Sequence, residues 1–285
     1  MFSDKMFWKE LNNGYKIPSI GFGVYKLDNF LECKNAVKKA LEIGYRLIDT
    51  AEFYLNEEAV GQAIKESNIK REEIFVTTKV WVSNFGKEKT FQAFENSLKK
   101  LDLDYIDMYM IHWPYGKYLE TYKAIEELYN YKKIKAIGVS NCSVKHLKEI
   151  LNIAKVKPVI NQLECNPYCQ RKDLEEIHQE NKIILESWSP LKRVDNNLYN
   201  NKVLLDLSIK YNKSISQIIL RWHVQKGFIP IPKSANESRI LENFLIWDFN
   251  LTNQEMSSIK SLDKNLLYQD PCSAETEKLI LSKSL

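Results

Sequence analysis

The sequence predicts an α/β protein with the fold of a (β/α)8 TIM barrel preceded by an N-terminal β-hairpin, and three observations support this prediction. Eight short runs of apolar, mostly β-branched residues recur along the 285 residues. Stretches with the periodicity of amphipathic helices separate these runs. The glycine fingerprint of a doubly wound sheet is incomplete, because the segment from Gly21 to Lys26 lacks the third glycine. We therefore expect one domain over residues 1–285.

The predicted elements begin with a β-hairpin over residues 7–17, which turns at Asn13-Gly14. Each of the eight apolar runs is short and bounded by turn residues, which is typical of parallel strands that are buried on both faces. The expected strands are, in chain order, Ile20–Val24, Leu47–Asp49, Ile74–Lys79, Tyr105–His112, Ala136–Ser140, Val159–Glu164, Ile183–Ser187 and Phe228–Pro232.

The helices between the strands each show one apolar face. The pattern predicts helices over Leu31–Ile43 and Phe91–Leu101. Ser214, with Gln217 three residues later, has the spacing of a capping box and predicts a helix that runs to about Gln225. A further helix is expected to begin near Ala235, directly after the last strand.

Composition narrows the classes of partner. Only six of the 41 basic residues are arginine, and the lysines are dispersed among acidic residues, which argues against a nucleic-acid partner. No apolar run reaches the length of a membrane helix. The five cysteines form no C-x-x-C pair, so we expect no metal site and free thiols in a reducing cytoplasm.

Polar side chains follow successive strands where a barrel carries its chemistry, at the carboxyl ends. Asp49 ends the second strand with Tyr54 close behind it, Lys79 ends the third, and His112 ends the fourth. A nearby ammonium lowers the pKa of a phenol, so we expect Lys79, held by Asp49, to make Tyr54 a better acid. His112 would hydrogen-bond a carbonyl oxygen. The set suits protonation of a carbonyl group that is receiving a hydride.

Each of these four residues also has an ordinary structural interpretation. Lys79 could be a solvated rim residue, Asp49 a helix cap, Tyr54 a packed ring and His112 a core histidine. Taken singly, each of these interpretations is the more common one. Their occurrence at three successive strand ends of one barrel favours a shared site.

A second polar cluster follows the last strand. Lys233 and Ser234 precede the helix expected near Ala235, and a helix N-terminus favours a bound anion. Arg239 adds a forked guanidinium six residues after Lys233. The alternative is a surface arginine that pairs with Glu242 on the same helix.

Aromatic residues are expected to form the substrate side of the site. Tyr25, Trp81 and Trp113 lie just past the first, third and fourth strands, so they would give a mostly apolar pocket anchored by Tyr54 and His112. The alternative is that one or two of these rings merely plug the top of the barrel. The segment after Leu262 is short, so we expect it to leave the pocket open to small carbonyl compounds.

The chain resembles the aldo-keto reductase superfamily from about Lys9 to Asp263, and most closely the short bacterial-type members that reduce glyoxal and methylglyoxal. The resemblance rests on seven blocks in order and on the Trp188-Ser189-Pro190-Leu191 segment. These blocks are Gly21-Phe22-Gly23-Val24-Tyr25, Ile48-Asp49-Thr50-Ala51 with Tyr54, Thr78-Lys79-Val80-Trp81, Ile111-His112-Trp113-Pro114, Ile137-Gly138-Val139-Ser140-Asn141, Asn161-Gln162-Leu163-Glu164, and Ile229-Pro230-Ile231-Pro232-Lys233-Ser234 leading into Arg239.

The resemblance implies an NADPH-dependent reductase of small aldehydes and ketones, which acts as a monomer. Asp49, Tyr54, Lys79 and His112 match the catalytic tetrad of the family, with Tyr54 as the proton donor. The resemblance also implies that the cofactor lies against residues of five kinds. These are the carboxamide partners Ser140, Asn141 and Gln162; the stacking ring of Trp188; the 2′-phosphate ligands Lys233, Ser234 and Arg239; the adenine neighbours Glu242 and Asn243; and further contacts at Gly23, Val24, Asp49, Ser189, Leu191 and Ile231.

Two positions depart from the family pattern. Leu55 stands where glycine is more common, which puts the shape of the loop beside Tyr54 in question. Cys142 follows Ser140-Asn141 where phenylalanine is more common, and it would place a smaller, oxidisable side chain under the cofactor.

Two other functions compete with the reductase. A regulatory barrel would bind NADPH with little turnover, as the potassium-channel beta subunits of the family suggest. An aldolase would use Lys79 as a Schiff-base nucleophile, although an adjacent Asp49 would keep that amine protonated.

Overall fold

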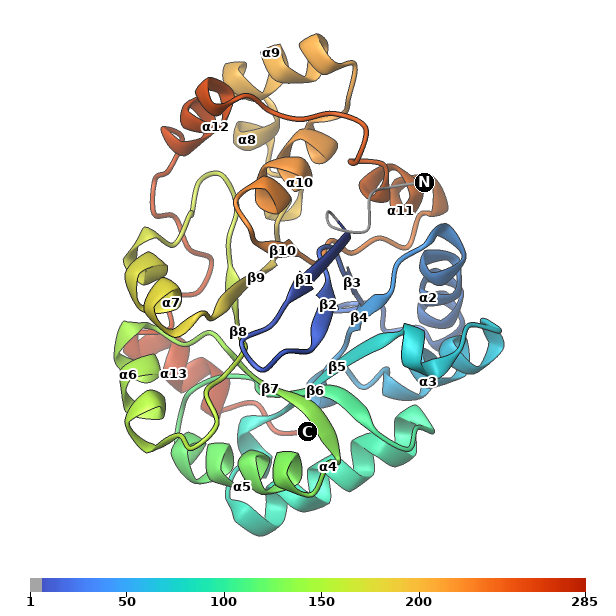
Figure 1. Cartoon of the computed structure of the whole chain (residues 1–285), viewed down its shortest axis with the longest axis vertical. Coiled ribbons are helices and arrows are strands. Elements are labelled where there is room, and N and C mark those ends of the chain that lie inside the picture. The colour runs from blue at the N-terminus through green and yellow to red at the C-terminus, as the bar shows by residue number, and fades with distance from the viewer. Residues whose placement is uncertain (1–6) are drawn as a thin grey trace.

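Eight parallel strands form one sheet in the computed structural model of the chain, which describes residues 7–285 (Figure 1). The first six residues of the proposed domain lie outside the described part. Neighbouring strands follow the order of the chain, and all eight predicted strands are confirmed. They are β3 (Phe22–Gly23), β4 (Leu47–Asp49), β5 (Phe75–Val80), β6 (Ile106–Ile111), β7 (Ile134–Ser140), β8 (Ile160–Glu164), β9 (Ile184–Trp188) and β10 (Ile229–Pro230).

The two ends of this sheet meet through backbone hydrogen bonds. The amide of Gly21 donates to the carbonyl of Pro230 over 3.0 Å, and the amide of Gly23 donates to Pro232 over 3.1 Å. These contacts join the segment of β3 to that of β10, so the curved sheet closes into the predicted barrel, with the helices around its outside (Figure 1).

The helices follow the predicted pattern, with shifted starts. The helix α2 (Phe30–Ile43) buries the apolar face that includes Val37 and Leu41, and α10 (Ile215–Gln225) has the predicted Ser214–Gln217 capping box. The other helices of the described part are α3 (Glu57–Glu66), α4 (Lys87–Leu101), α5 (Tyr118–Asn130), α6 (Val144–Ile153), α7 (Glu175–Asn181), α8 (Asn196–Tyr199), α9 (Lys202–Tyr211), α11 (Glu237–Phe244), α12 (Asn253–Lys260) and α13 (Ala274–Leu281), besides short 3-10 turns such as η1 (Glu52–Tyr54).

The N-terminal hairpin covers one end of the barrel. Its strands β1 (Trp8–Glu10) and β2 (Lys16–Pro18) pair antiparallel, as predicted. Leu11 and Ile17 pack in one buried cluster with Leu47 and Ile229, which begin β4 and β10. The hairpin therefore closes the amino ends of the strands and leaves their carboxyl ends, where the polar residues gather, as the accessible end of the barrel.

No helix within residues 7–285 is long and apolar enough to cross a membrane. The same residues contain no group of three or more His, Cys, Asp or Glu side chains arranged to hold a metal ion.

Candidate active site

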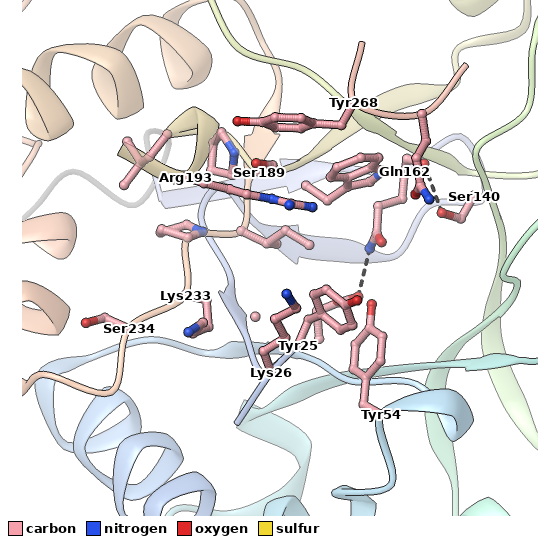
Figure 2. A pocket seen from close by; sticks show the side chains of 18 of the residues that line it. Tyr25, Lys26, Tyr54, Ser140, Gln162, Ser189, Arg193, Lys233, Ser234 and Tyr268 are labelled. Atoms are coloured by element: carbon pink, nitrogen blue, oxygen red, sulfur yellow. Dashed lines mark hydrogen bonds between the residues drawn. The ribbon is translucent and has the colours of Figure 1, made fainter. Parts of the chain in front are cut away.

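A cavity of about 830 Å³ opens at the carboxyl ends of the strands. Every site residue predicted from the sequence lines it except Val24 and Lys79, which are buried behind its wall. Figure 2 shows Lys233 and Ser234 at one end, with Tyr54 and Ser140 at the other. Residues in or directly after the eight strands thus share one continuous cavity.

Lys79 and Asp49 form a buried ion pair beside this cavity. The Nζ atom of Lys79 lies 2.7 Å from each carboxylate oxygen of Asp49 and 2.9 Å from the carbonyl oxygen of Thr50. Parallel pairing of β4 with β5 brings the two chains together, since Asp49 is in register with Thr77, two residues before Lys79. All three N–H groups of the ammonium therefore have acceptors, and the carboxylate is held by its counter-ion.

Tyr54 ends the short turn η1, and its half-buried ring lies above this pair. The Nζ atom of Lys79 is 5.1 Å from the centroid of the Tyr54 ring. The expectation that Lys79 lowers the pKa of Tyr54 is wrong for this structure. Burial, followed by the negative charge of Asp49, raises the pKa of Tyr54 well above its usual value. Asp49 offsets the ammonium charge, so the phenol stays protonated.

His112 follows β6 and faces Tyr54. The two rings meet edge to face with centroids 5.5 Å apart. Burial and the nearby charge of Lys79 hold the pKa of His112 well below its usual range. The imidazole is therefore neutral near pH 7. No described residue hydrogen-bonds its buried Nδ1 atom, which suits a tautomer that carries its proton on Nε2.

Aromatic rings form the wall around Tyr54 and His112. Tyr25 lies 5.0 Å from Tyr54 between ring centroids. Phe53 stacks on Trp81 at 3.9 Å, and Trp81 meets His112 edge to face at 5.0 Å. All of these rings line the cavity. The pocket around the two polar groups is therefore largely apolar, as the sequence predicts.

The C-terminal segment closes over this wall, which corrects the expectation of an open pocket. Helix α13 brings Ile280 into a buried cluster with Trp81 and Trp113. The indole of Trp81 donates a 2.9 Å hydrogen bond to the carbonyl of Lys283. Ile280 and Lys283 both line the cavity. The segment is short, but because it folds back as a helix, it narrows the substrate end.

Hydrogen bonds connect Ser140, Asn141 and Gln162, which are predicted to bind the nicotinamide carboxamide, to one another or to neighbouring site residues. The indole of Trp188 donates to Oδ1 of Asn141 over 2.9 Å, and Asn141 donates from Nδ2 to the hydroxyl of Ser140 and to the carbonyl of His112. Gln162 donates to Asp49 over 2.8 Å. These contacts fix the side chains that line the cavity between the aromatic wall and its far end.

The far end of the cavity carries cations that have no carboxylate partner among the described residues. Within residues 7–285, no carboxylate lies within 4.0 Å of the charged groups of Lys233, Arg239 or Arg193, so the predicted alternative pair of Arg239 with Glu242 is absent. Helix α11 begins at Glu237 rather than near Ala235, and its N-cap Asn236 already accepts from the amide of Arg239. The side chains, more than the helix amides, are thus available to a phosphate-bearing group.

Several residues that shape the site were not predicted. Asn56 is buried, donates to the carbonyls of Val24 and Leu27, and so fixes the loop beside Tyr54. Arg193 extends into the cavity, under the ring of Tyr268 from the C-terminal segment (Figure 2). Glu186 lies beneath Gln162. Only Glu186 gave a usable sequence signal, because a charged residue interrupts an apolar strand.

The two departures from the family pattern have clear structural consequences. Leu55 adopts the left-handed conformation, with φ of 56°, and its side chain is 73% exposed. The loop keeps the glycine-like backbone without glycine. Cys142 is fully buried and does not line the cavity, and burial raises the pKa of its thiol. A buried, protonated thiol is poorly reactive, so the expectation of an oxidisable group under the cofactor is not supported.

Comparison with known proteins assigns the chain to a family. A model of the aldo/keto reductase family matches residues 19–264. Glyoxal reductase of Bacillus subtilis is 48% identical over 257 residues, which are 90% of this chain and 92% of the relative. Methylglyoxal reductase DkgA of Escherichia coli is 44% identical over 258 residues, covering 90% and 93%. The chain belongs to the aldo/keto reductase family and is therefore an oxidoreductase.

Solved structures agree with this assignment. An aldo-keto reductase from a Medee basin deep-sea metagenome library superposes with a TM-score of 0.91 at 44% identity, covering 93% of this chain and 99% of that one. A Bombyx mori aldo-keto reductase in complex with NADP gives a TM-score of 0.88 at 35% identity, covering 95% and 96%. The barrel fold is thus shared with enzymes of the family.

Proposed function

We propose that the protein reduces small aldehydes and ketones to alcohols with NADPH. The overall reaction consumes one carbonyl group, one NADPH and one proton, and yields one alcohol and one NADP⁺. The observation that carries this proposal is the edge-to-face pair of Tyr54 and His112 over the buried Lys79–Asp49 ion pair. Two neutral hydrogen-bond donors thereby face one apolar pocket.

Tyr54 and His112 would act on the carbonyl oxygen as catalytic residues. Tyr54 is protonated at physiological pH and donates its proton as the oxygen gains electrons. His112 donates a hydrogen bond from Nε2 and fixes the direction of the carbonyl. As the proton leaves Tyr54, the ammonium of Lys79 stabilises the developing phenolate, and Asp49 holds that ammonium in place.

The residues of the cavity fit NADPH, which supplies a hydride when bound. Lys233 and Arg239 would hold the 2′-phosphate, and this contact would favour NADPH over NADH. Gln162, Asn141 and Ser140 would hold the nicotinamide amide, with Trp188 against the ring. The NADP complex of the Bombyx mori relative supports this choice of cofactor.

Small dicarbonyl compounds fit the substrate end best. Ile280 and Lys283 from the C-terminal segment further narrow the space beside the aromatic wall. Two relatives of similar length carry the names glyoxal reductase and methylglyoxal reductase. We therefore propose methylglyoxal-type carbonyls as substrates.

The competing functions fit the site less well. An aldolase needs a free amine, whereas all three N–H groups of Lys79 have acceptors in a buried ion pair. A regulatory barrel with little turnover has no need of a protonated Tyr54 facing a neutral His112. Turnover itself decides between this barrel and the reductase.

Steady-state NADPH oxidation with methylglyoxal tests the proposal. We expect Tyr54→Phe to lower kcat by roughly 10²–10⁴-fold, because it removes only the proton donor. NADPH binding, measured by the quenching of tryptophan fluorescence, should be unchanged. Tyr15→Phe, in the hairpin at the opposite end of the barrel, is the matched control. Full activity of Tyr54→Phe would refute the role of Tyr54, and tight NADPH binding without turnover in the unmodified protein would favour the regulatory barrel.

We further propose that the protein acts as a monomer in the cytoplasm. All five cysteines are free thiols and four of them are buried, which suits a reducing compartment. Light scattering on the purified protein tests the monomer, which a mass of twice 33.5 kDa would contradict.

A further inference from the structure

Glu186 is a buried carboxyl group inside the barrel that the proposed reaction does not use. It lies in the middle of β9, where its side chain has no exposed surface. In the sheet it is in register with Gln162 on β8 and with the apolar Ile229 on β10. Trp188, two residues further along the same strand, lines the cavity. Glu186 therefore lies one layer below the cavity floor.

Gln162 connects Glu186 to Asp49. Its Nε2 atom donates to Oδ2 of Asp49 over 2.8 Å and to Oε1 of Glu186 over 2.5 Å. A side-chain amide has two N–H groups, and both are now used. The amide oxygen of Gln162 remains as an acceptor, and Gln162 lines the cavity. The two carboxyl groups thus fix which end of the amide is offered to a ligand.

The charges around Glu186 do not balance if it ionises. The titratable groups that face it are Asp49 from β4, Lys79 from β5 and Tyr54 from η1. The one cation among them, Lys79, already pairs with Asp49. Oε2 of Glu186 has no hydrogen-bond partner among the described residues. Burial and the charge of Asp49 accordingly raise the pKa of Glu186 to about 8.

We propose that Glu186 is a positioning residue that orients Gln162 and whose charge sets the preference of the site between oxidised and reduced cofactor. This inference rests on the proposed placement of the nicotinamide beside Gln162. NADP⁺ and NADPH differ at the nicotinamide, which is cationic only when oxidised. A neutral Glu186 leaves the oxidised form without an additional counter-charge, which favours its release. An ionised Glu186 attracts the oxidised form alone.

The ratio of the two dissociation constants tests this inference without turnover. The Kd of NADP⁺ and the Kd of NADPH are measured by quenching of tryptophan fluorescence from about pH 6.5 to 9.5. Effects of the shared phosphates cancel in the ratio. We expect Kd(NADP⁺)/Kd(NADPH) to fall roughly tenfold as the pH rises through 8, because a partly screened charge pair forms only with NADP⁺.

Two substitutions localise the effect. Glu186→Gln stays neutral and still offers an oxygen to Nε2 of Gln162. Both NADP⁺ and NADPH should therefore bind to this variant, and the ratio Kd(NADP⁺)/Kd(NADPH) should no longer depend on pH. Glu164→Gln is the matched control. Glu164 is also buried in β8 with its pKa raised to about 7, but it accepts from the backbone amide of Tyr268 instead of from Gln162. Its substitution should leave the pH dependence intact.

A measurement on the unmodified protein guards against a variant that fails to fold. Calorimetry near pH 8 in two buffers of different ionisation enthalpy should show proton release when NADP⁺ binds and none when NADPH binds. A flat ratio, a slope that survives Glu186→Gln, or a slope abolished by Glu164→Gln would overturn the inference. A pH-dependent ratio without carbonyl turnover would support it while refuting the reductase proposal.

Discussion

The ammonium of Lys79 contacts both carboxylate oxygens of Asp49 at 2.7 Å, and the two side chains have exposed fractions of only 0% and 3%. Removing one partner leaves an uncompensated charge in the barrel, which costs about 3–5 kcal/mol. We therefore expect Lys79→Met and Asp49→Leu each to lower the free energy of unfolding by about that amount.

The double variant Lys79→Met/Asp49→Leu should lose less than the sum of the two single losses, because no buried charge remains. Urea unfolding of the four proteins at one pH measures this coupling. Strict additivity of the two single effects would show that the pair contributes nothing as a pair.

His178 in α7 makes the free energy of unfolding depend on pH in the acidic range. Its Nε2 atom lies 3.2 Å from Nδ2 of Asn161, whose N–H can donate only to a neutral imidazole. Burial and then the charge of Arg171 lower the pKa of His178 to about 4. The unfolded chain takes up a proton near pH 6.5 and the folded chain does not, so stability falls as the pH decreases below 6.5.

At about pH 5 this one group costs about 2 kcal/mol relative to about pH 7.5. His178→Gln keeps an acceptor for Asn161 but cannot titrate. The difference in unfolding free energy between the two proteins should therefore shift by about 2 kcal/mol in favour of the variant over this range. An unchanged difference would mean that His178 is not held neutral.

Leu55 stores backbone strain next to Tyr54. A left-handed conformation costs a residue with a Cβ atom about 1–2 kcal/mol, and glycine avoids this cost but loses more entropy on folding. We expect Leu55→Gly to raise the free energy of unfolding by about 0.5–1 kcal/mol. The matched control is Leu31→Gly in α2, another exposed leucine, which should lower it by about 1 kcal/mol.

Thermal unfolding of the three proteins compares the two positions. Loss of stability in Leu55→Gly as large as that in Leu31→Gly would show that the φ of 56° is not strained.

The strands were predictable from sequence because a parallel strand that is buried on both faces leaves a run of apolar residues, as at Leu47 and Ile48. The polar residues at strand ends were predictable because topology alone gathers them. Asn56 and Arg193 were not, since their roles depend on where a loop folds. The direction of the Tyr54 pKa was missed for a related reason. The sequence places Lys79 and Asp49 near Tyr54, but it gives neither the depth at which the phenol is buried nor the balance between the two charges.

The hydrogen bond from Gly21 to Pro230 joins residues more than two hundred positions apart. Contacts of such long sequence separation form slowly and late, because the chain must first lose the entropy of closing the loop between them. Tyr25 and Lys233 follow this junction on its two strands, and both line the cavity. We therefore expect that a chain whose barrel has not closed has no complete binding site, and that gain of cofactor binding reports closure of the barrel.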